Sequence, residues 1–372
     1  MGASVAYHLA RRGVTRTVLV EREPLLGAGS TGRNAGGVRH QFSTPENVQL
    51  SIESIRAIER FRDEVGGEAD FHQDGYLFLL SAPESVETFR QSVAVQRRLG
   101  VDVAWLDAGE AASLAPGLRT DGVLAATFCP RDGIADPGGV TLGFAKAAQA
   151  AGVSIERETE VTGVRVAGGR VAGVETTRGS IATPMVVNAA GPHARGIARM
   201  VGLEVPVDPF RRHIFIAQRP PGAGPWDVPT SRIMVIDFDS TFYFHREGAG
   251  VLFGMGEPGE RSTFDLTVQW DFLERVTPVA ARRLPALADA PIARAWTGLY
   301  ETTPDGNPII GASRDLGGFF LITGFSGHGF QHSPAAGRAL ADVMTGRDPG
   351  LSLTPFALDR FAAPAVGERH VV

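Results

Sequence analysis

Two glycine-rich segments have the composition expected of a cofactor cradle. The first covers residues 27–39, and the second covers residues 324–329 and precedes a predicted helix. Glycine allows a ligand to approach the backbone closely, and the free N–H groups at the start of a helix favour a negatively charged group. We therefore expect both segments to face a bound cofactor. For the second segment, the alternative is a glycine-capped tight turn.

A metal centre and lysine-based catalysis find little support in the sequence. His328 and His332 are four residues apart, a spacing that can place two metal ligands on one helix face. They lack a His-Glu-x-x-His arrangement and an obvious third ligand, and Cys129 is the only cysteine. Lys146, the sole lysine, lies in an amphipathic helical pattern where a lysine is usually solvated. We predict no metal site and no Schiff-base chemistry.

The start of the sequence resembles half of a dinucleotide-binding unit. Such a unit has glycines between its first strand and first helix, and an acidic residue after its second strand that binds ribose hydroxyls. Gly2 precedes a predicted helix, and Glu21 follows a predicted strand at residues 17–20. The alternative is a buried helix and strand with a surface Glu21. Because the first strand and two glycines of the unit are missing, we hypothesise that Met1 is internal to a longer protein.

Composition excludes several classes of partner. The formal net charge is −5 and the sequence has no block of Lys and Arg, so we expect no nucleic-acid partner. No apolar run approaches the roughly 20 residues that a membrane-spanning helix needs. Residues 1–12 lack the features of a secretory signal. These observations predict a soluble, cytoplasmic protein without a membrane span.

Hydrophobic periodicity predicts a mixture of helices and strands. We expect helices at residues 3–12, 43–65, 94–114, 265–275 and 333–345. We expect strands at residues 17–20, 76–80, 155–161, 171–175, 185–188, 212–217, 241–245, 251–255 and 319–323.

Five segments spread over nearly the whole chain suggest a family. They are residues 2–21, 29–37, 186–193, 298–305 and 323–330. Together, and in this order, they resemble the D-amino-acid oxidase superfamily of flavoproteins, in particular the branch with glycine oxidase and sarcosine oxidase. No single segment is specific alone, but the set is specific for the superfamily.

This resemblance implies a mixed α/β fold with bound FAD. A Rossmann-like FAD-binding domain would comprise residues 1–75, 130–206 and 296–372, without its first strand. An inserted antiparallel-sheet substrate domain would comprise residues 76–129 and 207–295. The implied cofactor-binding residues are Gly2, Glu21, Arg22, Ser30, Thr31, Arg33, Gly37, Val161, Ala190, Gly191, Gly324, Gly327, His328, Gly329, Phe330 and Gln331.

Within that set, Glu21 would bind the adenosine ribose and Val161 would contact the adenine region through its backbone. Ser30, Thr31 and Arg33 would lie near the pyrophosphate. The N–H groups of residues 324–329 would stabilise the negative charge of a reduced flavin.

Four residues are candidates for the catalytic pocket: Arg39, His245, Tyr300 and Gln331. In relatives, an arginine near the position of Arg39 clamps the substrate carboxylate; the alternative is a surface arginine paired with an acid. His245 and Arg246 end a predicted strand, so at most one of them faces the site. Tyr300 matches a cavity-lining tyrosine, with a core tyrosine as the alternative.

Three departures from the family narrow the expectation. Gly298 stands where monomeric sarcosine oxidases have the cysteine that links FAD, so we expect FAD to be non-cysteinyl and non-covalent. Gln331 replaces a lysine that binds substrate carboxylate, which weakens the case for sarcosine as substrate. Leu252 corresponds, in an approximate alignment, to the lysine that activates oxygen, so oxidase and dehydrogenase both stay open.

The expected reaction is FAD-dependent oxidation of an amine or amino acid, with a secondary, N-methyl, glycine-like or proline-like amino acid as substrate. Hydride transfer to flavin N5 would give an imine that hydrolyses. One alternative is the flavin-bearing subunit of a multisubunit amino-acid dehydrogenase, which passes electrons to partner subunits. Others are a non-catalytic FAD-binding assembly factor and a structural protein without a cofactor.

Overall fold

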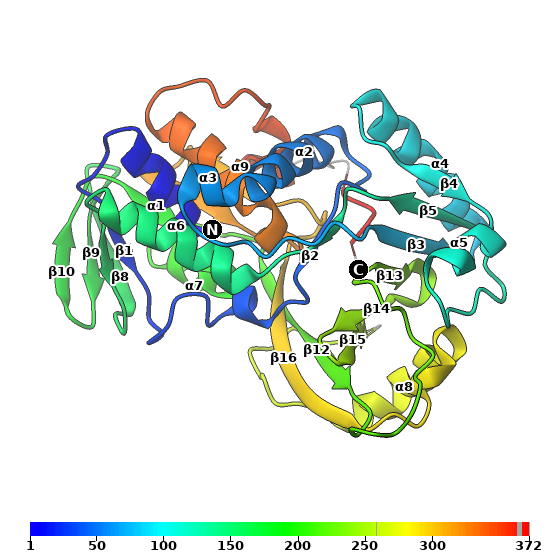
Figure 1. Cartoon of the computed structure of the whole chain (residues 1–372). Helices are drawn as coiled ribbons and strands as arrows, with labels where there is room; N and C mark the ends of the chain where they lie inside the picture. Colours follow the sequence, from blue (N-terminus) through cyan, green and yellow to red (C-terminus); the bar gives the residue numbers. More distant parts are fainter. Residues whose placement is uncertain (258, 363–366, 372) are drawn as a thin grey trace.

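Four helices form one layer of the molecule, as the computed structural model shows for residues 1–257, 259–362 and 367–371 (Figure 1). Helix α1 (Gly2–Arg11) packs between α6 (Pro137–Ala150) and α9 (Gly329–Met344), and α2 (Pro45–Glu59) packs on α9. The helices α1 and α9 approach closely because Ser4 faces Gly337, where an added Cβ would lie 2.2 Å from the Ser4 Oγ. The short α3 (Phe61–Val65) continues α2.

Short strands lie beside this helical layer. Strand β1 (Val18–Val20) pairs in parallel with β7 (Ser154–Glu156), and β11 (Val186–Asn188) pairs in parallel with β18 (Phe319–Thr323). Strand β17 (Ile309–Ala312) is antiparallel to β18. A separate meander contains β8 (Val161–Ala167), β9 (Arg170–Thr176) and β10 (Gly179–Ala182), and α7 (Ala194–Arg199) follows β11. Parallel strands covered by helices are the expected features of a Rossmann-like domain.

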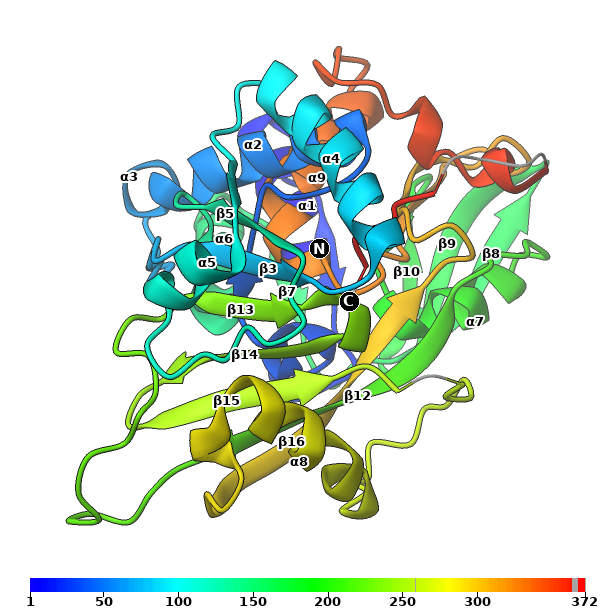
Figure 2. The same ribbon diagram turned by 90° about the vertical axis from the view of Figure 1, so that its right-hand side faces the viewer.

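An eight-stranded sheet forms the second part of the molecule. Its order is β16 (Ile292–Thr302), β12 (Asp208–Ala217), β15 (Gly250–Met255), β14 (Phe242–Glu247), β13 (Met234–Asp237), β3 (Tyr76–Leu80), β5 (Ala125–Cys129) and β4 (Ala104–Leu106). Figure 2 shows β3, β13, β14 and β15 following one another down the view. All pairs are antiparallel except β13 with β3. A two-stranded ribbon of β2 (Gly37–Val38) and β6 (Gly133–Ile134) completes the strands of the described chain.

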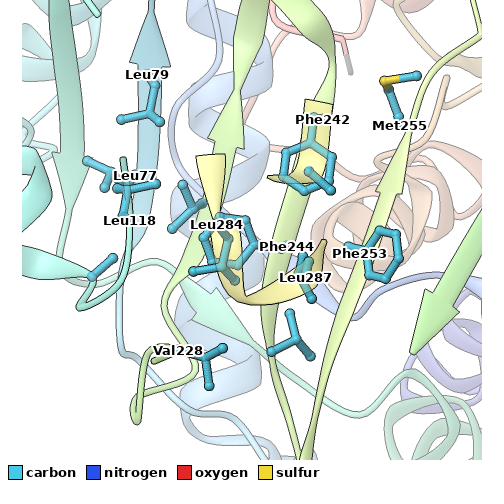
Figure 3. Packing of buried hydrophobic residues seen from close by; sticks show 14 of the residues in the cluster. Leu77, Leu79, Leu118, Val228, Phe242, Phe244, Phe253, Met255, Leu284 and Leu287 are labelled. Carbon is cyan, nitrogen blue, oxygen red and sulfur yellow. The ribbon is translucent and has the colours of Figure 1, made fainter. Parts of the chain in front are cut away.

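Alternate residues of each strand point to opposite faces of the eight-stranded sheet. Both faces carry buried side chains. One face packs against α5 (Ala108–Leu114) and α8 (Asp271–Arg283). Figure 3 shows part of this core, with side chains such as Leu77, Phe244 and Phe253 gathered on one side. α4 (Pro83–Arg98) packs on β3 through Phe89. The other face lies toward the helical part and forms the floor of a cavity.

The predicted fold class is confirmed: the chain has a Rossmann-like part and a substrate sheet, although the sheet contains one parallel pair. The predicted domain boundaries stay a prediction. Strand β16 (Ile292–Thr302) crosses the boundary expected at residue 296. Among the described residues, no helix is both long enough and apolar enough to span a bilayer.

Several predicted elements are wrong in their bounds. Residues 94–114 form the end of α4, then β4, then α5, because Val101 and Val103 are buried in an extended segment and Asp107 caps a new helix. The predicted strand 155–161 is two strands, interrupted at Glu158, whose φ is +52°. The helix expected at 265–275 begins only at Asp271, and strands β10 and β16 were not predicted.

Candidate active site

A cavity lies between the two parts of the molecule and encloses about 1280 Å³, including space open to solvent. Small-molecule sites often form where domains meet. Its roof consists of the two glycine-rich segments and the two residues that follow the second one. They contribute Ser30, Thr31, Arg33, Asn34, Ala35, Gly37, Arg39 and residues 326–331. Both segments therefore face the same space, as expected from their composition.

The floor is one face of the eight-stranded sheet. One row of neighbours across it runs Ile214, Gly254, Tyr243 and Ile236, each paired with the next. Gly254 has no side chain, and an added Cβ there would lie 2.4 Å from the Tyr243 hydroxyl, so the tyrosine ring lies across that position. Ile214, Ile236 and Tyr243 all line the cavity, which makes this part of the floor apolar with a phenol at its centre.

Close contacts show that the roof has little room for added side chains. A Cβ at Gly37 would lie 2.0 Å from the Tyr76 hydroxyl, and a Cβ at Gly327 would lie 2.3 Å from the Tyr300 ring. These glycines let the backbone of the roof meet the tyrosines of the floor. Glu301 holds the start of the second segment in place. Its carboxylate accepts hydrogen bonds from the hydroxyl of Thr323, the residue before the segment, at 2.9 Å and from the Phe325 N–H at 3.4 Å.

Replacing Gly327 by alanine should displace the Tyr300 ring and lower the retention of the FAD that the sequence resemblance implies. Gly327 has φ +97°, where a non-glycine residue costs roughly 1–3 kcal/mol. Gly346→Ala is the matched control, since Gly346 has φ +69° but nothing within 4 Å of the added Cβ. We expect similar losses of thermal stability in both variants, measured by calorimetry, but loss of bound flavin absorbance only in Gly327→Ala. Equal flavin retention would contradict the role of this contact.

The structure brings many of the predicted cofactor residues to the cavity. Its lining includes Ser30, Thr31, Arg33, Gly37, Gly327, His328, Gly329, Phe330 and Gln331. The other predicted residues lie outside the lining: Gly2, Glu21, Arg22, Val161, Ala190, Gly191 and Gly324.

Most of these outer residues occupy the ends of secondary structure elements. Glu21 follows β1, Ala190 follows β11 by two residues, and Gly324 follows β18 directly. Gly2 begins α1, where an added Cβ would lie 3.1 Å from Leu19 Cδ1, as expected for a glycine that lets a helix pack on a strand. Their contact with FAD stays a prediction.

The predicted substrate residues separate into two groups. Arg39, Tyr300 and Gln331 line the cavity, whereas His245 does not. His245 is on the same face of β14 as Tyr243, but it is 1% exposed, and its Nδ1 contacts the Arg246 carbonyl at 2.8 Å. Arg246 does not line the cavity either.

The amide of Gln331 and the guanidinium of Arg39 are already engaged. Gln331 Oε1 accepts the Arg39 backbone N–H at 2.6 Å. The two terminal nitrogens of Arg39 donate to the backbone carbonyls of Gln41 and His370, and its guanidinium lies 3.9 Å from the centre of the Phe42 ring. Burial lowers the pKa of Arg39. Arg39 therefore holds residues near the C-terminal segment while bordering the cavity.

The polar lining residues that sequence reasoning missed include Tyr76, Arg212, Tyr243 and Glu301. Burial raises the pKa of the phenols of Tyr76 and Tyr243, and of the Glu301 carboxyl. The one available signal was alternation in β12, where Arg212 and Ile214 must share a face.

His328 is a buried polar group of the lining with a free acceptor position. Burial lowers its pKa well below 6.5, so the ring is neutral at neutral pH. Its Nε2 is buried without a hydrogen-bond partner among the described residues. An unpartnered buried nitrogen is costly, and a bound group with a donor would remove that cost. His332 is buried behind it, with Nε2 2.9 Å from the Ser51 hydroxyl.

A second buried cluster, His40, Cys129 and Asp132, has the composition of a metal site. Its polar atoms satisfy one another: Asp132 Oδ1 accepts from the His40 N–H at 2.8 Å and lies 2.6 Å from His40 Nδ1, and Oδ2 accepts from Gln41 at 3.2 Å. Cys129 Sγ lies 3.8 Å from His40 Nδ1, and burial raises the pKa of its thiol. We assign this cluster to holding His40 and Gln41, the residues that follow Arg39, in place.

A cavity between a Rossmann-like domain and a substrate sheet, roofed by glycine-rich backbone, is typical of an enzyme that binds a nucleotide cofactor. Comparison with known families agrees. The DAO family, described as FAD dependent oxidoreductase, matches residues 1–343, and the chain belongs to this family. It is therefore an FAD-dependent oxidoreductase, which confirms the resemblance seen in the sequence.

Individual relatives cover almost the whole chain. FAD-dependent oxidoreductase domain-containing protein 1 of Xenopus laevis is 32% identical over 420 residues, covering 100% of this chain and 83% of that protein. Sarcosine oxidase subunit beta of Arthrobacter sp is 28% identical over 375 residues, covering 99% of this chain and 90% of that protein. The crystal structure of L-proline dehydrogenase from P. horikoshii has a TM-score of 0.90 and 33% identity, covering 98% and 96% of the two chains.

Proposed function

We propose that this protein oxidises the CH–NH or CH–NH₂ group of an amino acid or amine, with FAD as the oxidant. The observation that supports this best is the cavity itself, which joins a glycine-rich roof to an apolar, tyrosine-bearing floor. A small secondary or N-methyl amino acid, glycine-like or proline-like, suits such a floor. The similarity to L-proline dehydrogenase and to sarcosine oxidase subunit beta favours the same substrate class.

The proposed chemistry asks little of the protein as acid or base. FAD held by the two glycine-rich segments would supply the hydride acceptor for the carbon next to the unprotonated amine, and the imine product would hydrolyse in water. The residues of this chain orient the amine and exclude water. Tyr300, Arg39 and Gln331 border the substrate in this proposal, and His245 supports the floor from outside the lining. His328, neutral and with a free Nε2, can accept a hydrogen bond from a bound group.

FAD attachment is proposed to be non-covalent. Gly298 lies against the first glycine-rich segment, where an added Cβ would be 3.0 Å from the Arg33 Cβ and 3.2 Å from the Arg33 carbonyl oxygen. A larger side chain at this position would displace that segment. Because residue 298 is glycine, no bond between a cysteine and FAD can form at this position.

A dehydrogenase is favoured at least as much as an oxidase. Leu252, at the position expected for an oxygen-activating lysine, is 4% exposed in an apolar cluster with Ile214, Ile236 and Tyr243. No fixed positive charge can come from this residue to stabilise superoxide-like character. Electrons would then pass to another acceptor.

The test is anaerobic absorbance of the FAD-loaded protein mixed in turn with L-proline, sarcosine, glycine and D-amino acids. Bleaching of the oxidised flavin band by one of them, followed by its return with an electron acceptor, is the expected result. A yellow protein that no amine bleaches would contradict amine oxidation and favour an FAD-binding assembly factor.

A second candidate function is the flavin-bearing subunit of a multisubunit amino-acid dehydrogenase. The similarity to a protein whose name describes it as a subunit, sarcosine oxidase subunit beta, favours it. Affinity purification from the native organism would recover stoichiometric partner chains in that case. Turnover by the purified chain alone, at the rate of the native preparation, would contradict it.

A further inference from the structure

The floor of the cavity carries one cation, Arg212. Arg212 and Ile214 are alternate residues of β12, and both line the cavity. Arg212 is paired across the sheet with Gly298, which has no side chain to cover it. The guanidinium therefore lies at the polar end of an otherwise apolar floor, with its carbon 4.9 Å from the centre of the Tyr300 ring. Stacking on an aromatic ring restrains an arginine side chain and leaves its N–H edges free to bind.

Only part of this guanidinium is in use. Nη1 donates to the Arg211 carbonyl and to Glu260 Oε2, both at 2.9 Å. Nε is buried without a partner, and Nη2 takes part in no hydrogen bond among the described residues. The Nε–Nη2 edge thus has no hydrogen-bond partner among the described residues. Two parallel N–H groups of this kind match a carboxylate, which they bind in a bidentate manner.

Arg39 differs from Arg212 in this respect. Both of its terminal nitrogens donate to backbone carbonyls, one of them in the segment of residues 367–371. That segment is itself anchored by the buried Glu368, which accepts hydrogen bonds from the Ser43 hydroxyl at 2.6 Å and from the Thr44 hydroxyl at 3.0 Å. The geometry makes Arg39 a positioning residue for this wall of the cavity, where Val371 joins the lining.

We propose that Arg212 binds the carboxylate of the substrate and selects amino acids over amines without a carboxylate. This inference rests on the proposed function. Arg212 would also supply the cation that Gln331 cannot supply, since Gln331 is neutral and its Oε1 accepts the Arg39 N–H. The Glu260 side chain is 7% exposed and forms an ion pair with Arg212. Because this ion pair offsets part of the Arg212 charge, it limits how tightly Arg212 holds the substrate carboxylate.

The ion pair gives two substitutions with opposite expected effects. Arg212→Gln should raise the KM for L-proline or sarcosine roughly 10-fold to 100-fold, the range for loss of a charge-assisted hydrogen bond. Glu260→Gln should lower the same KM, because Arg212 regains its full charge. The KM for prolinamide, which lacks the carboxylate, should stay within twofold of the wild type in the Arg212→Gln variant. Arg212→Lys should recover part of the loss, and retained flavin absorbance shows that each variant is folded.

Calorimetric titration with pyrrole-2-carboxylate, which has no oxidisable CH–NH group, separates the two proposals. Binding that Arg212→Gln abolishes, in a protein that oxidises no amine, would support the carboxylate site and contradict the proposed function. Amine oxidation with an unchanged KM for L-proline in Arg212→Gln would support the function and overturn the role of Arg212. An equal rise in KM for L-proline and prolinamide would also overturn it, because the effect would then not depend on the carboxylate.

Discussion

Replacing Arg283 by leucine should lower the free energy of unfolding by about 3–5 kcal/mol, the range measured when one partner of a buried ion pair is removed. Arg283 ends α8 and is 1% exposed. Its Nε donates to the Asp237 carboxylate at 2.8 Å, and its Nη2 donates to the Ser81 hydroxyl at 2.9 Å. The substitution leaves Asp237, also 1% exposed, with only the more distant Arg282 at 3.3 Å.

Urea unfolding followed by circular dichroism measures this loss. The matched control is the double variant Arg283→Leu with Asp237→Leu, which removes the unpaired charge as well as the pair. Because hydrophobic replacement of both partners is often close to neutral, the double variant should recover more than half of the loss. A double variant less stable than Arg283→Leu alone would contradict the ion-pair account.

Acidification should destabilise the protein between pH 6.5 and pH 4, before most carboxylates titrate. Burial lowers the pKa of His245 and His370 to about 4, and of His8 and His332 to about 3. In the unfolded chain these rings bind protons below the ordinary value near 6.5, so the unfolded state gains protons that the folded state excludes.

The sign and size of this effect follow from the proton difference. Each such histidine removes about 1.4 kcal/mol of stability per pH unit as the pH falls through the window. Four of them together would remove an amount comparable with an ordinary stability of about 5–15 kcal/mol by pH 4. Chemical denaturation at several pH values measures the slope. His8→Leu should reduce it by one proton, and an unchanged slope in that variant would show that His8 is not part of the effect.

Sequence patterns located the parts of the site that depend on local chemistry. The glycine-rich roof, Tyr300, His328 and Gln331 belong to short motifs, and all of them reach the cavity. The floor depends instead on strand register. Tyr243 reaches it because it is paired with Gly254, which is in turn paired with Ile214, and no local pattern specifies those partners.

The same distinction explains the errors in the fold. The parallel pairing of Tyr76 with Met234 joins residues far apart in sequence, so the sheet could be expected but its order could not. Apolar side chains recur along residues 94–114, and their spacing predicts one helix, whereas Val101 and Val103 are buried in the segment between α4 and β4. Periodicity alone does not separate these cases for short apolar runs.

Cys129 gives this protein a built-in chemical reporter. The chain has one cysteine, which is 1% exposed on β5 beside His40 and Asp132, and burial raises the pKa of its thiol. Thiol reagents react with an exposed thiolate. In the folded state the Cys129 thiol is buried and its pKa is raised, so both accessibility and ionisation are reduced. The rate of labelling therefore measures how often β5 and the neighbouring His40 and Asp132 open to solvent. With no other thiol in the sequence, every label marks the same place in the fold.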